Sequence, residues 1–195
     1  MRSSAASDVY KRQALMTRGY YEMPSDHIYI RPESWDKPFE APEHVCSSYD
    51  NCHVPWGSTH EKTWHLVKTL PHVSGLFVWT GFDYLGEPTP YWCPSRSSFF
   101  GIVDLAGFPK DVYYMYKSEW TDEPVLHIFP HWNWKVGEPV DIWAYYNNAD
   151  EVELYLNGKS LGVQQKTDST YHVSWRVPFT PGTLRAVSRL GGKEV

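Results

Sequence analysis

Residues 75–88 have the sequence GLFVWTGFDYLGEP, and the rest of the chain can be placed by reference to them. The apolar run from Leu76 to Trp79 has no break, which is typical of a short strand buried on both faces of a parallel sheet. The residues that follow become polar, aromatic and rich in Gly and Pro. In proteins built on parallel sheets, ligand sites lie in the loops that leave the C-terminal ends of the strands. The stretch therefore predicts a buried strand that opens onto a ligand site.

Trp79 lies where the predicted strand passes into the loop. Its indole can place a flat apolar face against the C–H side of a sugar ring while the ring N–H donates a hydrogen bond. The same side chain would also suit a hydrophobic core. The sequence leaves both interpretations of Trp79 open.

The composition excludes one class of partner and favours another. The net charge is -5 and no cluster of Lys and Arg is visible, so a nucleic-acid partner is not expected. Aromatic residues make up 16% of the chain and include ten Trp, more than packing normally requires. This surplus favours a carbohydrate partner. No apolar stretch is long enough to span a bilayer, so no membrane partner is expected.

The cysteines and histidines predict neither a metal site nor a cofactor. Cys46, Cys52 and Cys93 lack the C-x-x-C spacing of zinc sites, and the nine His lack a paired ligand spacing. A disulfide between Cys46 and Cys52 stays open as an alternative.

The first residues of the chain differ in character from the remainder. Residues 1–13, MRSSAASDVYKRQ, have no periodic apolar pattern and are similar to adapter sequence fused to gene fragments. We treat them as non-native and expect the native protein to begin upstream of Ala14. Residues 14–56 form a long, irregular, Pro-rich segment, which we expect to line the rim of a cleft.

Two helices are predicted on either side of the 75–88 stretch. Ser58 and Glu61 form a capping box that begins the first helix, and Pro71 ends it. Pro109 begins the second helix, which reaches about Trp120. Between them, residues 99–103 form a short apolar piece that resembles a strand.

Beyond residues 121–124, a predicted linker, the chain becomes all-β. Apolar and polar residues alternate over residues 140–144 and 171–177, and Asn157-Gly158 is the signal of a type I′ hairpin turn. Short strands with frequent turns favour an immunoglobulin-like sandwich. Residues 191–195 look like the start of a last hairpin, and we expect the chain to be truncated at this end as well.

Three linked motifs resemble glycoside hydrolase family 2, in particular the β-galactosidase-like members common in gut Bacteroidetes. FVWTGFDYLGEPTPY resembles the eighth barrel strand and its loop, and PSRSSFFGIVDLAGFPKDVYYMYKSEW resembles the next loop and the closing helix. VDIWAYYNNADEVELYLNGKSLG resembles the sandwich domain that comes next in the family. The resemblance implies an α/β fold followed by an all-β fold: the C-terminal part of a (β/α)₈ TIM barrel over residues 14–120, joined through 121–124 to an incomplete immunoglobulin-like β-sandwich over 125–195.

The resemblance also implies a reaction, the retaining hydrolysis of a terminal β-galactoside or a related oligosaccharide. Such enzymes use two carboxyl groups about 5 Å apart, both Glu in this family. The family's nucleophile would fall just before Ala14, and its acid/base lies further upstream. We therefore expect no catalytic residue in this chain, which would be inactive alone, and we expect the parent protein to be periplasmic or secreted.

The residues expected to bind substrate are Trp79, Asp83, Glu87, Arg96, Tyr49 and Asp50. Asp83 and Glu87 are not assigned as the catalytic pair, because a retaining pair approaches the sugar from opposite sides, which two strands achieve more easily than one loop. Both could accept hydrogen bonds from sugar hydroxyls, or could instead cap the loop or pair with Arg96. Arg96 itself could orient a sugar or remain a surface residue. Tyr49 and Asp50 belong to a loop that should face the cleft.

A second hypothesis belongs to a different functional class. The surplus of Trp and the missing pair of Glu would also fit a stand-alone carbohydrate-binding or adhesion module, in which the sandwich does the binding.

Overall fold

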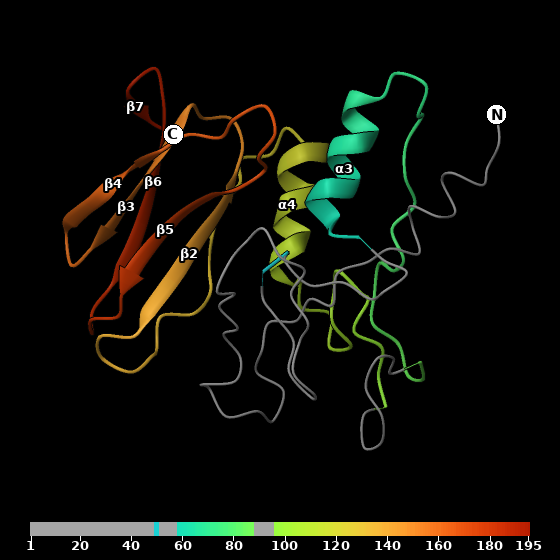
Figure 1. Ribbon diagram of the computed structural model, residues 1–195, viewed down its shortest axis with the longest axis horizontal. Coiled ribbons are helices and arrows are strands. Elements are labelled where there is room, and N and C mark those ends of the chain that lie inside the picture. Colours follow the sequence, from blue (N-terminus) through green and yellow to red (C-terminus); the bar gives the residue numbers. More distant parts are fainter. Residues whose placement is uncertain (1–48, 51–57, 88–95) are drawn as a thin grey trace. The chain divides into compact units, whose positions relative to one another are not determined.

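The computed structural model of the protein describes residues 49–50, 58–87 and 96–195 (Figure 1). The backbone divides into two compact units, Met1–Tyr113 and Tyr114–Val195. All three cysteines lie outside the described residues, and so do residues 1–13 and most of the irregular segment that comes after them.

Helix α3 (His60–Thr69) confirms the first predicted helix, but its N-terminus is capped differently. The N-cap residue is Thr59, whose side chain makes no capping bond. The Asp50 carboxylate replaces it and accepts hydrogen bonds from the backbone N–H groups of His60 (2.8 Å) and Glu61 (2.6 Å). The predicted capping box at Ser58 is therefore wrong, because a carboxylate from an earlier segment satisfies these two donors.

The apolar run from Leu76 to Trp79 is not the buried strand that the sequence predicts. It pairs with no described strand, and the Phe77 side chain is 78% exposed. Pairing begins only beyond Trp79, where residues 80–83 run parallel to residues 100–103 through an isolated bridge. The prediction assumed that this apolar run is buried on both faces. No described segment covers Phe77, so that assumption does not hold here.

Helix α4 (Asp111–Trp120) confirms the second predicted helix and begins shortly after Pro109. Asp111 lies in its first turn, where a carboxylate complements the positive end of the helix dipole.

The all-β region forms two antiparallel sheets (Figure 1). One has the order β1-β2-β5 and the other the order β4-β3-β6-β7. The strands are β1 (Leu126–Phe129), β2 (Pro139–Tyr146), β3 (Glu151–Leu156), β4 (Lys159–Gln164), β5 (Val173–Pro178), β6 (Leu184–Leu190) and β7 (Lys193–Glu194). Asn157 and Gly158 have φ values of 52° and 80°, which confirms the predicted I′-type turn between β3 and β4.

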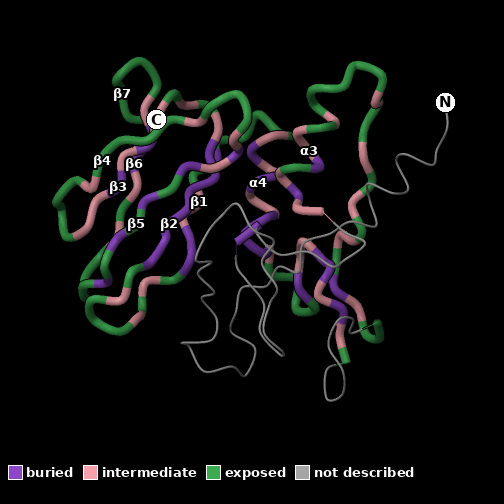
Figure 2. Tube along the Cα trace, in the orientation of Figure 1, coloured by how far each residue is buried: buried purple, intermediate pink, exposed green. Residues whose placement is uncertain are grey.

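Strand β2 is the centre of the apolar core of this unit. All of its residues from Val140 to Tyr146 are buried, whereas only alternate residues of β5 are (Figure 2). Ile142 lies opposite Trp175 of β5, and both are buried. Leu154 of β3 is also fully buried, and strands of the two sheets contact each other through β1 with β6 and β4 with β5.

The other face of β2 is covered by aromatic side chains. Trp143 stacks on His172 with ring centroids 3.5 Å apart, and Phe129 of β1 contacts Trp143 edge-on. On the same face His127 stacks on Tyr114 of α4 at 3.8 Å. The part of α4 that belongs to the second unit therefore covers this sheet, which explains why β2 is buried on both sides.

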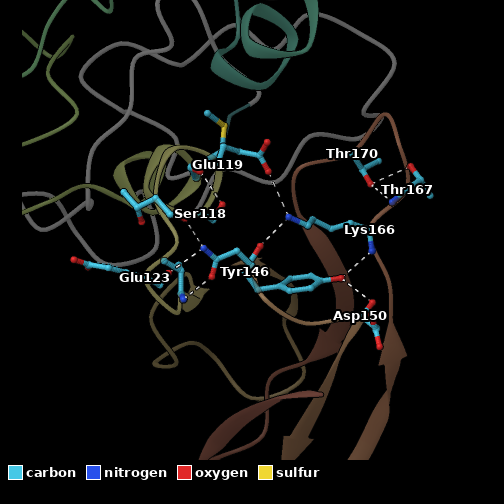
Figure 3. A network of polar contacts seen from close by, with 12 residues as sticks. Ser118, Glu119, Glu123, Tyr146, Asp150, Lys166, Thr167 and Thr170 are labelled. Carbon is cyan, nitrogen blue, oxygen red and sulfur yellow. Dashed lines mark hydrogen bonds and ion pairs between the residues drawn. The ribbon is translucent and has the colours of Figure 1, made fainter. Parts of the chain in front are cut away.

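Polar side chains tie the end of α4 to the β-strands (Figure 3). Lys166 forms an ion pair with Glu119 at 3.5 Å and donates a hydrogen bond to the Tyr146 carbonyl at 2.8 Å. Asn147 accepts a bond from the Val125 N–H and donates to the carbonyls of Thr121 (3.1 Å) and Glu123 (2.9 Å). The predicted linker 121–124 is thus held by a side chain that follows the end of β2.

Replacing Asn147 by Ala should destabilise this unit by about 1–3 kcal/mol, because three hydrogen bonds to backbone groups are lost together. The free energy of unfolding, measured by denaturant titration, checks this. Asn147→Asp keeps the acceptor for Val125 but turns a carboxylate oxygen toward the carbonyls of Thr121 and Glu123, so it should be no more stable than Asn147→Ala. Equal stability of all three proteins would contradict the role given to this side chain.

Candidate functional site

Three neighbouring side chains form the exposed end of the 75–88 stretch. The Trp79 side chain is 45% exposed, and its Nε1–H donates to the Tyr84 hydroxyl at 3.2 Å. The Tyr84 hydroxyl in turn donates to the Glu87 carboxylate. The two rings meet edge to face at 6.2 Å. Trp79 and Glu87, both predicted from the sequence, are therefore brought together through Tyr84.

Tyr84 is the member of this group that the sequence analysis missed. Its signal was an aromatic residue between two predicted site residues, but its link to both is visible only in the folded chain. Partial burial raises the pKa of the Tyr84 hydroxyl, and the bond to Glu87 raises it further. The hydroxyl therefore stays protonated and orients the Trp79 ring and the Glu87 carboxylate at the same time.

Arg96 lies at the base of the loop that carries this group. Its carbonyl accepts a hydrogen bond from the Gly86 N–H at 2.7 Å, and Ser97 pairs antiparallel with Leu85. The side chain of Arg96 is exposed. The backbone of Arg96 thus pairs with the start of the loop at Gly86, and its exposed side chain could reach a ligand.

Asp83 has a different environment from Glu87. Its side chain is only 4% exposed and forms an ion pair with Lys110, 1% exposed, at 2.6 Å. The same carboxylate accepts hydrogen bonds from the Gly101 N–H (2.7 Å) and the Ser98 hydroxyl (3.4 Å). Burial raises the pKa of Asp83, and Lys110 and the two other donors oppose that rise. The sequence offered Arg96 as the alternative partner, but the structure gives this role to Lys110.

The bond from Gly101 to Asp83 requires the two segments to lie very close together. A Cβ atom at residue 101 would stand 2.2 Å from the Asp83 nitrogen and 2.6 Å from the Val103 carbonyl oxygen. Only glycine permits this approach.

Tyr49 and Asp50 are buried, with Tyr49 at 0% exposure. Asp50 caps helix α3, so its carboxylate is already committed to two backbone donors. The first residue of that helix, His60, is buried as well; burial, followed by the positive charge of Lys110, lowers its pKa to about 3. These residues are buried, whereas Trp79, Tyr84, Glu87 and Arg96 are exposed or half-buried, where a ligand could reach them.

The exposed group suits a polyhydroxylated ligand. The Trp79 ring offers a flat apolar face, and the Glu87 carboxylate is an acceptor for hydroxyl groups. Among the described residues, no three His, Cys, Asp or Glu side chains are placed to hold a metal ion. Helices α3 and α4 have ten residues each, too few to cross a bilayer, and the described ranges contain no other helix.

Comparison with known proteins finds one matching family model and several similar glycosidases. A family model described as "Domain of unknown function (DUF4982)" matches residues 137–195. The β-galactosidase BoGH2A of Bacteroides ovatus is 63% identical over 182 residues, which are 93% of this chain and 21% of that protein. The crystal structure of a β-glycosidase from Bacteroides vulgatus superposes with a TM-score of 0.71 at 36% identity, covering 96% of this chain and 24% of that one.

The chain is homologous to family 2 glycoside hydrolases. The resemblance in the three motifs is thereby confirmed. A β-glucuronidase of Formosa agariphila is also similar, 34% identical over 127 residues, which are 63% of this chain and 12% of that protein. The chain spans about a fifth of the length of the curated β-galactosidase that it matches.

Replacing Lys110 by Met should cost about 3–5 kcal/mol of stability at neutral pH, because the charge of Asp83 is left buried without its partner. The loss should shrink as the pH falls. Without Lys110 the pKa of Asp83 rises further, and a protonated Asp83 tolerates burial. Urea unfolding at several pH values measures both effects.

Two further variants serve as controls for Lys110→Met. The double variant Asp83→Asn, Lys110→Met should regain part of the stability, and Lys62→Met on the exposed side of α3 should have little effect. A loss in Lys110→Met that is independent of pH would show that the ion pair is not its cause.

Proposed function

We propose that the protein to which this chain belongs is a retaining β-glycosidase that acts on terminal β-galactosides. The observation that carries the proposal is the 63% identity to a β-galactosidase over 93% of the chain. The aromatic and acidic group at the end of the 75–88 stretch supports it, because this group has the chemistry that a sugar-binding site needs. Related family members named β-glucuronidases make β-glucuronides the competing substrate.

In the same proposal, the first unit is the C-terminal part of a TIM barrel. The parallel bridge between Phe82 and Val103, next to helices α3 and α4, fits a βα barrel. Three apolar side chains of the stretch are strongly exposed: Phe77 (78%), Phe82 (64%) and Leu85 (78%). Further barrel strands would cover them.

The second unit would then be the immunoglobulin-like domain of the parent protein. Its two antiparallel sheets follow the orders β1-β2-β5 and β4-β3-β6-β7, and the chain crosses between sheets after β2, β4 and β5. Crossings of this kind and a buried Trp at the centre of a sheet are typical of such sandwiches.

Each candidate residue has a proposed role in sugar binding. Trp79 stacks on the ring, Glu87 accepts hydrogen bonds from its hydroxyls, and Tyr84 holds both in place. Arg96 reaches the substrate from the rim of the loop. Tyr49, Asp50 and Asp83 were expected to touch the sugar as well; their buried contacts support a positioning role for all three.

The stand-alone binding module is the weaker hypothesis. The identity to BoGH2A runs over 93% of this chain, so it covers both units and not the sandwich alone. A module that acted by itself would not need the first unit. The hydrolase therefore remains the proposal.

A chimera tests the assignment of Trp79. In BoGH2A, the 182 matched residues are replaced by those of this chain, and hydrolysis of a chromogenic β-galactoside and a β-glucuronide is measured. The chimera should prefer the galactoside, and Trp79→Ala in it should lower kcat/KM at least about tenfold, because a stacked aromatic contact is lost. Trp120→Ala, which removes an exposed Trp outside the group, is the matched control.

A preference of the chimera for the glucuronide would overturn the galactoside assignment. Equal activity of the Trp79→Ala and Trp120→Ala chimeras would instead remove Trp79 from the site.

The 195-residue chain by itself should not hydrolyse either substrate. Retaining hydrolysis needs a nucleophile and an acid/base on opposite sides of the sugar. Of the two acidic residues in the 75–88 stretch, Asp83 is committed to Lys110, so this stretch supplies Glu87 with no second carboxylate for the reaction. Release of the chromophore, measured with enough protein to detect a single turnover per hour, checks this. Hydrolysis that disappears in Glu87→Gln would show that the chain carries its own catalytic group.

A further inference from the structure

The outer face of the four-stranded sheet carries a cavity of about 640 Å³. Side chains of β3, β6 and β7 and the turn between β3 and β4 line it. The whole cavity lies within residues 137–195, the region matched by a family model without a known function. None of the residues proposed above to bind the substrate takes part in it.

Part of the lining of this cavity is apolar. Val187, only 4% exposed, and the ring of Tyr155 on the neighbouring strand both line it. The Tyr155 hydroxyl donates to Glu153 at 2.5 Å and accepts a bond from Arg189 at 3.0 Å. Both bonds hold the aromatic ring in one orientation before any ligand binds.

Glu153 anchors this arrangement. Hydrogen bonds from the Ser160 and Tyr155 hydroxyls, together with Arg189, lower the pKa of Glu153 to about 2. The ion pair between Arg189 and Glu153 measures 2.7 Å. Arg189 is thus committed to Glu153 and Tyr155, and its charge is balanced by the Glu153 carboxylate.

The turn residue Asn157 closes one end of the cavity with a fixed side chain. Its amide donates to the Pro181 carbonyl at 3.1 Å and accepts a bond from the Thr183 N–H at 3.0 Å. A Cβ at Gly182 would lie 1.9 Å from the Asn157 oxygen, so the two turns are packed tightly together. This end of the cavity is preformed.

Arg185, which also lines the cavity, differs from Arg189 because it can leave its ion-pair partner at low cost. It pairs with Glu194 at 2.9 Å, but the two side chains are 66% and 63% exposed. Ion pairs this exposed contribute little to stability, so the guanidinium can turn to a ligand at low cost. Glu153 balances the charge of Arg189, so among the residues that line the cavity Arg185 is the cation that a ligand could engage.

We propose that this cavity binds a saccharide residue that carries a carboxylate, such as a uronic acid in a glycan chain. The sugar ring stacks on Tyr155 above Val187, and its carboxylate takes a bidentate pair with Arg185. Glu194, released from Arg185, accepts a hydrogen bond from a sugar hydroxyl. This site is independent of the Trp79 group and of hydrolysis.

The binding experiment uses the full 195-residue chain with Trp79→Ala, so that the first site does not contribute. Isothermal titration compares methyl β-glucuronide, methyl β-galactoside and sodium acetate at constant ionic strength. We expect the glucuronide to bind most tightly, because it alone supplies both the ring and the carboxylate. Acetate binding as tightly as the glucuronide would reduce the cavity to an anion site and overturn the proposal, and so would equal binding of the two sugars or no binding at all.

Variants of Arg185 test the geometry. In the same background Arg185→Gln should weaken glucuronide binding about tenfold or more, since a charge-assisted pair is lost. Arg185→Lys keeps the charge but not the planar fork, so its affinity should fall between the two. Lys62→Gln, with the same change of charge outside the cavity, should bind like the parent. Thermal unfolding curves verify that each variant is folded, and unchanged affinity in Arg185→Gln would refute the site.

Discussion

The first unit depends on the ion pair between Asp83 and Lys110, which has almost no contact with solvent. Taking two charges out of water is costly, and the cost is recovered only if both charges are fully satisfied. Here the carboxylate also receives the Gly101 and Ser98 donors, and the Lys110 ammonium also donates to the Phe99 carbonyl at 3.2 Å. This ion pair and its hydrogen bonds therefore join three segments: the end of the 75–88 stretch, the segment 98–101, and the start of α4. The exposed group of Trp79, Tyr84 and Glu87 is built directly on this ion pair.

The second unit is stabilised in a different way. Its central strand, β2, is apolar or aromatic at nearly every position and is covered on both faces, by the other sheet on one side and by an aromatic layer with α4 on the other. The exception, Asp141, forms a bidentate pair with Arg176 (2.6 and 2.8 Å). The sequence predicted a strand buried on both faces at residues 76–79. In the structure the strand with this property is β2, at residues 140–146.

Local signals predicted the elements well, and long-range contacts account for most of the misses. Pro71 and Pro109 mark helix boundaries, and Asn157-Gly158 forces a turn, because each acts on its own backbone. The cap of α3 was missed because Asp50 reaches it from another segment, and the partner of Asp83 was missed because Lys110 is far away in the sequence. Trp79 and Glu87 were both expected to bind substrate, because they belong to one strand end and its loop. Their connection through the Tyr84 hydroxyl could not be predicted, since side-chain direction is decided only by folding.

The contact between Asn157 and Gly182 constrains how these loops can change during evolution. Asn157 holds a left-handed backbone conformation, and its amide fills the space that any larger residue at position 182 would need. Neither position can therefore vary alone without disturbing the other loop.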